Sequence, residues 1–234
     1  MLIAVTLVSL LAVGILFAMR VGLNAMDRSG ARLTGNRRVA SVERILESQV
    51  AAIMPVPALC MPGQDAPPAK VMFFQGEPTS MRFVSAYSLH EAWRGMPLVL
   101  EYQVIPGNNG EGVRLIVNER LYTGPKGVGA FCTGVAPDET GAVVPHFVPI
   151  EIGPASFVLA DKLAYCRFSY RFLPPQAPTD HVPAQWLPLW NKPILPSGIR
   201  IDMGPLRPDP AALQPVSLSI PVHVTRWPLG TYGY

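Results

Sequence analysis

The first nineteen residues carry no charged side chain, and only Thr6 and Ser9 among them are polar. As an α-helix, this stretch would be about 28 Å long, close to the hydrocarbon thickness of a bilayer. A cleaved signal peptide is disfavoured, because Met1 leads into the apolar stretch without a preceding basic region. We therefore expect residues 1–20 to form a transmembrane or assembly helix. Its apolar contact surface would comprise Leu2, Ile3, Val5, Leu7, Val8, Leu10, Leu11, Val13, Ile15, Leu16 and Phe17.

A second helical pattern follows over residues 21–54. Apolar side chains recur there at spacings of three and four, at Val39, Val42, Leu46, Val50 and Ile53. Charged residues lie between them, so the pattern predicts an amphipathic continuation of the first helix that ends before Pro55. The whole helix would be about 50 residues and about 80 Å long. This stripe is a candidate contact surface for partner subunits; the alternative is that it packs on the sheet of its own chain.

The rest of the chain, residues 55–234, is patterned for strands. Twenty-six prolines and twenty glycines imply many turns, and 55–70 is a proline-rich connector. Alternating apolar positions between turns predict strands at 71–74, 80–85, 97–104, 113–120, 146–152, 163–172, 199–203 and 216–224. No strand is followed by a helical pattern, which favours antiparallel pairing. The expected fold class is α+β, with a long N-terminal helix packed on an antiparallel β-rich head.

Motifs that carry enzymatic chemistry are not found in the sequence. The four histidines stand apart from one another, without the spacing of metal ligands. The stretch GPKGVG at 124–129 lacks the ending of a phosphate-binding loop, and Asn108–Glu111 fits a hairpin turn better than a calcium loop. The net charge is only +3, without a long basic run, which argues against nucleic acid as a partner. We expect no catalytic residue, metal ligand or cofactor, and a protein that is not an enzyme.

Three cysteines allow at most one disulfide within the chain. Cys60 and Cys132 stand in turn-rich stretches and are the candidate pair if the body lies in an oxidising compartment. Cys166 falls within a strand pattern and is expected to be a small buried apolar residue. Spacing alone leaves the connectivity open.

Several stretches in order along the chain resemble one known family. They are the apolar segment MLIAVTLVSLLA at 1–12, the paired arginines at 37–38, MRFVSA at 81–86, PLVLEYQV at 97–104, the strand pattern at 163–173, Trp186 and Trp190, and IRI at 199–201. The chain resembles the type IV pilin-like proteins, and within them the minor pseudopilins of J type from type II secretion systems, also called general secretion pathway protein J. In that family a peptidase motif ending in glutamate precedes the apolar segment. Met1 stands just after the position of that glutamate, so we expect the translation start to lie upstream.

This resemblance implies a structural subunit at the tip of the pseudopilus that helps to start filament assembly and protein export. It implies three parts: a membrane and assembly helix (1–20), an amphipathic continuation (21–54) and a periplasmic head (55–234). The protein would be a single-pass inner-membrane protein, later incorporated into a periplasmic filament. Its partners would be I-type and K-type minor pseudopilins, the major pseudopilin and inner-membrane lipid. Two alternatives remain open: a minor pilin of a type IV pilus, and a signal-anchored periplasmic enzyme or binding module.

Overall fold

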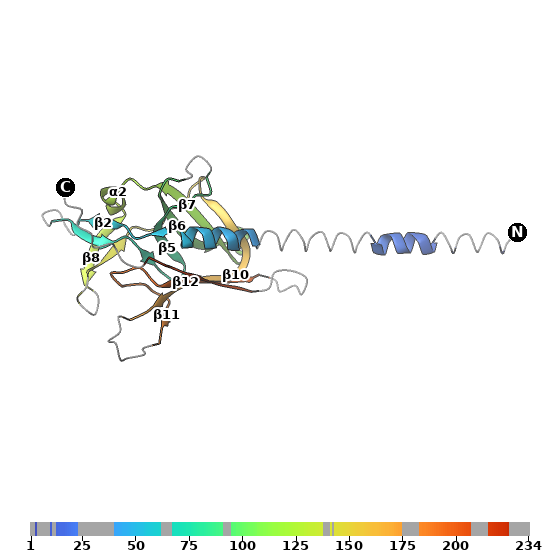
Figure 1. The fold of residues 1–234 in the computed structure, drawn as a ribbon. Helices are drawn as coiled ribbons and strands as arrows, with labels where there is room; N and C mark the ends of the chain where they lie inside the picture. The colour runs from blue at the N-terminus through green and yellow to red at the C-terminus, as the bar shows by residue number, and fades with distance from the viewer. Residues whose placement is uncertain are drawn as a thin grey trace.

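The computed structural model describes residues 3, 10, 13–22, 40–61, 67–90, 95–137, 141, 143–174, 183–206 and 215–224. About half of these residues form antiparallel β-sheet. Residues 13–22 and 40–51 are helical. Figure 1 shows residues 40–51, which we call the packed helix, lying along the sheet, whereas residues 13–22, the N-terminal helical segment, lie apart from it.

Nine of the described strands belong to one sheet. Its main path runs β1-β5-β6-β7-β10-β12-β13, with β4 paired to β5 and β11 paired to β10. The bounds are β1 Ile53–Met54, β4 Gln75–Gly76, β5 Ser80–Ser85, β6 Leu98–Pro106, β7 Val113–Leu121, β10 Phe157–Phe172, β11 Gln185–Leu187, β12 Gly198–Pro205 and β13 Val216–Pro221. A short 3₁₀ turn, η2 (Asn108–Gly110), connects β6 to β7. Every pairing in this sheet is antiparallel, as the strand patterns predicted.

Alternation of side chains gives β5 and β6 two buried faces. On the helix side, a core joins the packed helix to alternate residues of β5, β6 and β7, such as Phe83, Leu100 and Val117. On the other side, Val84 and Val99 belong to a second, smaller core. This second core lies beneath a layer that we call the cover. The cover comprises β2 (Pro57–Cys60), β3 (Ala69–Met72), α2 (Pro125–Gly129), β8 (Cys132–Pro137) and β9 (Val143–Phe147), with the flanking residues Phe73 and Phe131.

The expected fold class, a long N-terminal helix packed on a head, is wrong. The packed helix ends at residue 51, because Ile53 and Met54 leave the helical pattern to pair with Ser85 and Val84 of β5. A helix over 40–51 reaches only about 18 Å. Sheet is the main structure of the described chain instead, at 48% strand against 19% helix. Two strands, β2 and β3, lie within or beside the stretch expected to be a plain connector.

The predicted membrane span is also corrected. Within the stretches described above, no helix is both long enough and apolar enough to cross a bilayer. This finding overturns the predictions of a transmembrane helix, a prepilin-type N-terminal segment and a single-pass inner-membrane location. Some of the residues assigned to that helix, namely Leu2, Val5, Leu7, Val8 and Leu11, lie outside the described residues.

Candidate functional site

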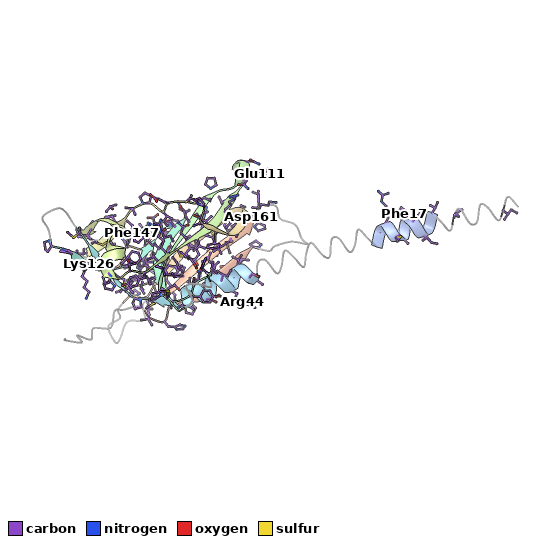
Figure 2. All side chains as sticks on the ribbon, turned by 90° about the horizontal axis from the view of Figure 1, so that it is seen from above. Phe17, Arg44, Glu111, Lys126, Phe147 and Asp161 are labelled. Atoms are coloured by element: carbon purple, nitrogen blue, oxygen red, sulfur yellow. A yellow bond between two sulfur atoms is a disulfide. The ribbon has the colours of Figure 1, made fainter. Side chains whose placement is uncertain are left out.

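The described residues of the predicted apolar contact surface are uncovered. Ile3, Leu10, Val13, Ile15, Leu16 and Phe17 each expose between 59% and 77% of their surface. Met19 and Val21 in the same segment are also exposed. Figure 2 shows Phe17 on the N-terminal helical segment, away from the side chains of the sheet. Exposed apolar groups gathered on one helix are typical of a contact surface for another molecule.

The described residues of the apolar stripe in the second helical pattern are buried, in contrast to those of the first. Val42, Leu46 and Val50 are buried in the helix-side core, and Ile53 reaches the same core from β1. Val39 lies outside the described residues. The stripe therefore packs on the sheet of its own chain, and these side chains are not available to a partner.

Gln49 is a polar residue on this buried side of the packed helix, and it is fully buried. Its side-chain carbonyl accepts a hydrogen bond from the Tyr102 hydroxyl of β6. Its backbone carbonyl accepts one from Ser85 Oγ of β5 at 2.8 Å. Burial, together with the negative charge of Glu119, raises the pKa of Tyr102 well above its usual value, so the hydroxyl remains a donor. The helix is thereby fixed in position along the sheet as well as held against it.

Glu119 of β7 continues this network toward the loop after β5. One carboxylate oxygen accepts hydrogen bonds from Gln49 Nε2 and from the Leu89 backbone N–H, each at 2.8 Å. The other oxygen accepts from Ser88 Oγ at 3.0 Å and from the His90 backbone N–H at 3.2 Å. The carboxylate thus joins the packed helix, β7 and the loop at 86–90. Sequence reasoning missed both residues, although a glutamine within an apolar stripe was a signal for Gln49.

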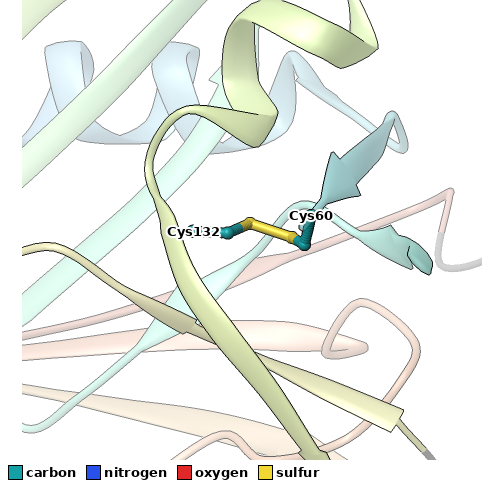
Figure 3. Close-up of a disulfide and its surroundings, with 2 residues drawn as sticks. All are labelled: Cys60 and Cys132. Atoms are coloured by element: carbon teal, nitrogen blue, oxygen red, sulfur yellow. A yellow bond between two sulfur atoms is a disulfide. The ribbon is translucent and has the colours of Figure 1, made fainter. Parts of the chain in front are cut away.

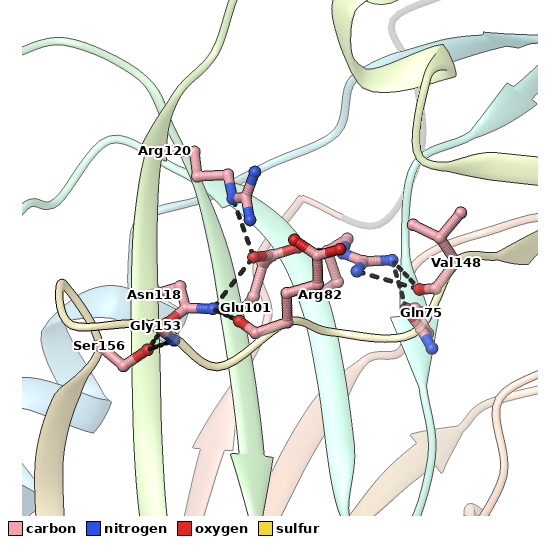
Figure 4. Close-up of polar contacts among 9 residues, drawn as sticks. Gln75, Arg82, Glu101, Asn118, Arg120, Val148, Gly153 and Ser156 are labelled. Carbon is pink, nitrogen blue, oxygen red and sulfur yellow. Dashed lines mark hydrogen bonds and ion pairs between the residues drawn. The ribbon is translucent and has the colours of Figure 1, made fainter.

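A second polar centre lies on the opposite side of the sheet, around two fully buried charges (Figure 4). Arg82 Nε of β5 donates to Glu101 Oε1 of β6 at 2.9 Å. The rest of the Arg82 guanidinium donates to Gln75 Oε1 at 2.8 Å and to the backbone carbonyl of Val148 at 3.2 Å. Burial lowers the pKa of Arg82, and the charge of Glu101 opposes this effect. An arginine stays protonated in proteins, so the two charges form an ion pair.

The second oxygen of Glu101 binds two side chains of β7, and one of these also binds the segment that follows the cover. It accepts from Arg120 Nε at 3.1 Å and from Asn118 Nδ2 at 3.3 Å. Asn118 also donates to the Glu151 backbone carbonyl at 2.8 Å and accepts from Ser156 Oγ at 2.6 Å. These hydrogen bonds connect β5, β6 and β7 to residues 148–156. Ser156 donates to the side-chain amide of Asn118 and not to a basic group.

Cys60 and Cys132 are joined by a disulfide bond, with their Cα atoms 5.5 Å apart (Figure 3). This is the candidate pair from the sequence, and the bond links β2 to β8 within the cover. Cys166 of β10 is a free, buried cysteine in the helix-side core. In the part of the chain that the structure describes, no three His, Cys, Asp or Glu side chains gather in a group that could hold a metal ion.

In the folded protein, Cys166 is expected to resist alkylation by iodoacetamide at pH 8. Burial, and secondarily the charge of Asp202, raises its pKa to about 12. Since only the thiolate reacts, about one thiol in ten thousand would be reactive at pH 8. Mass spectrometry should detect modification of Cys166 only after denaturation. Rapid labelling of the folded protein would show that the thiol is accessible and contradict this burial.

No family model matches this chain, and a search of curated proteins finds no match to it either. The arrangement of its residues is therefore the basis for a functional proposal.

Proposed function

We propose that this protein is a structural subunit of a filament, namely a minor pseudopilin that acts at the tip of a type II secretion pseudopilus. In this role it helps to start filament assembly and, through it, protein export. The observation that carries the proposal is the contrast between two helical stretches. The packed helix has its apolar stripe covered by its own sheet, whereas Val13, Leu16 and Phe17 of the N-terminal helical segment are uncovered.

This contrast supports a division between a part that folds by itself and a part that would make the contacts of assembly. The sheet and the packed helix share a buried core without any contribution from residues 13–22. The N-terminal helical segment is therefore not needed to complete that core. Its exposed apolar side chains would be covered by the apolar segments of neighbouring subunits, with a gain of about 25 cal/mol for each Å² buried. The proposed neighbours are I-type and K-type minor pseudopilins and the major pseudopilin.

The polar anchors give the packed helix a role in this proposal. Gln49 and Glu119 fix the helix along the sheet through hydrogen bonds of 2.8 Å. Arg44 and Glu47, on its opposite side, remain exposed. The packed helix, which follows the N-terminal helical segment in the chain, is therefore held firmly on the sheet.

A photo-crosslinking amino acid in place of Phe17 tests the proposal in cells that carry the secretion system. We expect crosslinks to the other pseudopilins from position 17 and none from position 44, the matched exposed site on the packed helix. In parallel, Phe17→Asp should lower export about tenfold or more, since a loss of 1.4 kcal/mol of association corresponds to tenfold. Arg44→Asp should leave export unchanged.

The melting temperature of both variants should equal that of the unmodified protein, because both side chains are exposed. Normal export by Phe17→Asp, or the absence of pseudopilin crosslinks from position 17, would overturn the proposed function.

A further inference from the structure

We propose that the Cys60–Cys132 disulfide is a redox-sensitive clasp that holds the cover closed over the Arg82–Glu101 ion pair. Reduction would open the cover and leave the main sheet and the packed helix folded. This proposal does not depend on the assembly role described above.

The cover is built from pieces that are weak individually. Strands β2 and β3 form one two-stranded sheet, and β8 and β9 form another, outside the nine-stranded sheet. A two-stranded hairpin is marginally stable by itself in water. The disulfide joins the two hairpins directly, although its cysteines are 72 residues apart in the sequence.

Non-covalent contacts between the hairpins show where the cover would separate. The Phe73 ring beside β3 lies 5.5 Å from that of Phe147 in β9, in an edge-to-face arrangement, and 6.1 Å from that of Phe131. Gly129 of α2 fits closely against the backbone of β2: a Cβ atom there would stand 2.2 Å from the Leu59 carbonyl oxygen. Aromatic pairs of this kind contribute modestly, so the covalent bond is the strongest link across this seam.

The Arg82–Glu101 ion pair lies beneath the cover, and its burial has a cost that opening would relieve. The Arg82 guanidinium lies under the cover, 4.9 Å from the centre of the Phe131 ring and 5.6 Å from that of Phe147. Arg82 and Glu101 are almost fully dehydrated in the closed state. Because dehydration of two charges is costly, opening the cover returns hydration energy. This energy partly offsets the loss of apolar packing and of the contacts that Arg82 makes with Val148 and the two rings.

The core on the helix side of the sheet does not depend on the disulfide. Its core contains residues of the packed helix and of β5, β6, β7, β10, β12 and β13, and neither Cys60 nor Cys132 belongs to it. Continuous backbone pairing connects these strands. Opening the cover should therefore leave this core in place.

Reduction by a dithiol proceeds by exchange. The thiolate of the dithiol attacks one sulfur of the Cys60–Cys132 bond, forms a mixed disulfide and releases the other cysteine as a thiolate. The second thiol of the reagent then closes its own ring and releases the first cysteine. Two electrons pass to the protein sulfurs, each sulfur takes up a proton, and the dithiol becomes a cyclic disulfide.

Hydrogen–deuterium exchange of the full chain, with and without dithiothreitol, tests the proposal. Reduction should speed exchange about a hundredfold or more in peptides from 57–60, 132–137 and 143–147, the usual scale of a disulfide's contribution. Peptides from 98–106 and 163–170 should change by less than about twofold, because the helix-side core persists. Reoxidation should restore protection in the cover.

Two variants complete the test. Cys60→Ser/Cys132→Ser should reproduce the reduced pattern without any reductant, and Cys166→Ser should exchange like the oxidised protein in the cover. The proposal is overturned if the cover stays protected after reduction, since other contacts would then hold it closed. It is equally overturned if protection falls alike in the cover and in 98–106, since the disulfide would then support the whole fold.

Discussion

Replacing Glu101 with leucine is expected to lower the free energy of unfolding by about 3–5 kcal/mol, the usual cost of breaking a buried ion pair from one side. The penalty comes from Arg82, which would keep its charge in a site that is fully buried. Its remaining acceptors, Gln75 Oε1 and the Val148 carbonyl, are neutral and do not replace the carboxylate. Urea denaturation followed by circular dichroism measures this decrease in stability.

Arg120 provides a matched control, because it contacts the same carboxylate from a different environment. Its side chain is 47% exposed and can turn into water when the carboxylate is removed. We expect Arg120→Met to cost less than about 1 kcal/mol, as exposed ion pairs do. An equal decrease in stability in Glu101→Leu and Arg120→Met would contradict the assignment of the penalty to burial.

The double variant Arg82→Met/Glu101→Leu separates the buried charge from the packing around it. Both charges are then absent and apolar groups of similar size remain, so much of the stability that Glu101→Leu removes should be recovered. The coupling energy of this cycle belongs to the pair, because each side chain is the other's charged partner at 2.9 Å. Failure of the second substitution to recover any stability would show that packing, and not the isolated charge, causes the effect.

The strands were the most predictable part of this fold. In 80–85 and 98–104, apolar residues recur at every second position, and this local pattern suffices to identify a strand. They are Met81 and Phe83 in the first stretch, and Leu98, Leu100, Tyr102 and Val104 in the second. The strand β2 was missed because it begins at Pro57 within a proline-rich stretch. Proline is tolerated at the first residue of a strand. The neighbouring prolines, however, made this stretch resemble a connector and not a strand.

The end of the helix was not predictable from local pattern. Ile53 continues the spacing of Val42, Leu46 and Val50, yet it belongs to β1. Its partner Ser85 is far along the chain, and competition between continuing a helix and pairing with a distant strand is decided by tertiary contacts. The predicted stripe therefore identified residues that are buried together but assigned one of them to the wrong element.

The polar centres could not be predicted from any single stretch of the sequence, because their residues come from different elements. Arg82 and Glu101 interrupt two of the most apolar strands, and charged residues at such positions signal a buried pair. Their contact requires the register of β5 on β6, in which these two residues stand directly opposite each other. The four donors to Glu119 come from the packed helix and the loop at 86–90, so they also meet only after folding.

Replacing Leu46 with alanine is expected to cost about 3–5 kcal/mol of unfolding free energy, the range for a large-to-small change in a close-packed core. Leu46 is fully buried in the middle of the packed helix, between Val42 and Val50 on the same face. Polar anchoring through Gln49 keeps the helix in place on the sheet, so the cavity cannot readily close by a shift of the helix. Chemical denaturation should show one transition at a lower urea concentration.

Glu47→Ala is the matched control, because Glu47 is the next residue and is exposed. Alanine is a good helix former, so this variant should change stability by less than about 0.5 kcal/mol. If Leu46→Ala instead cost less than about 1 kcal/mol, the packed helix would not share a cooperative core with the sheet. In that case the packed helix could open separately from the sheet, and the hydrogen bonds of Gln49 would not be enough to keep it in place.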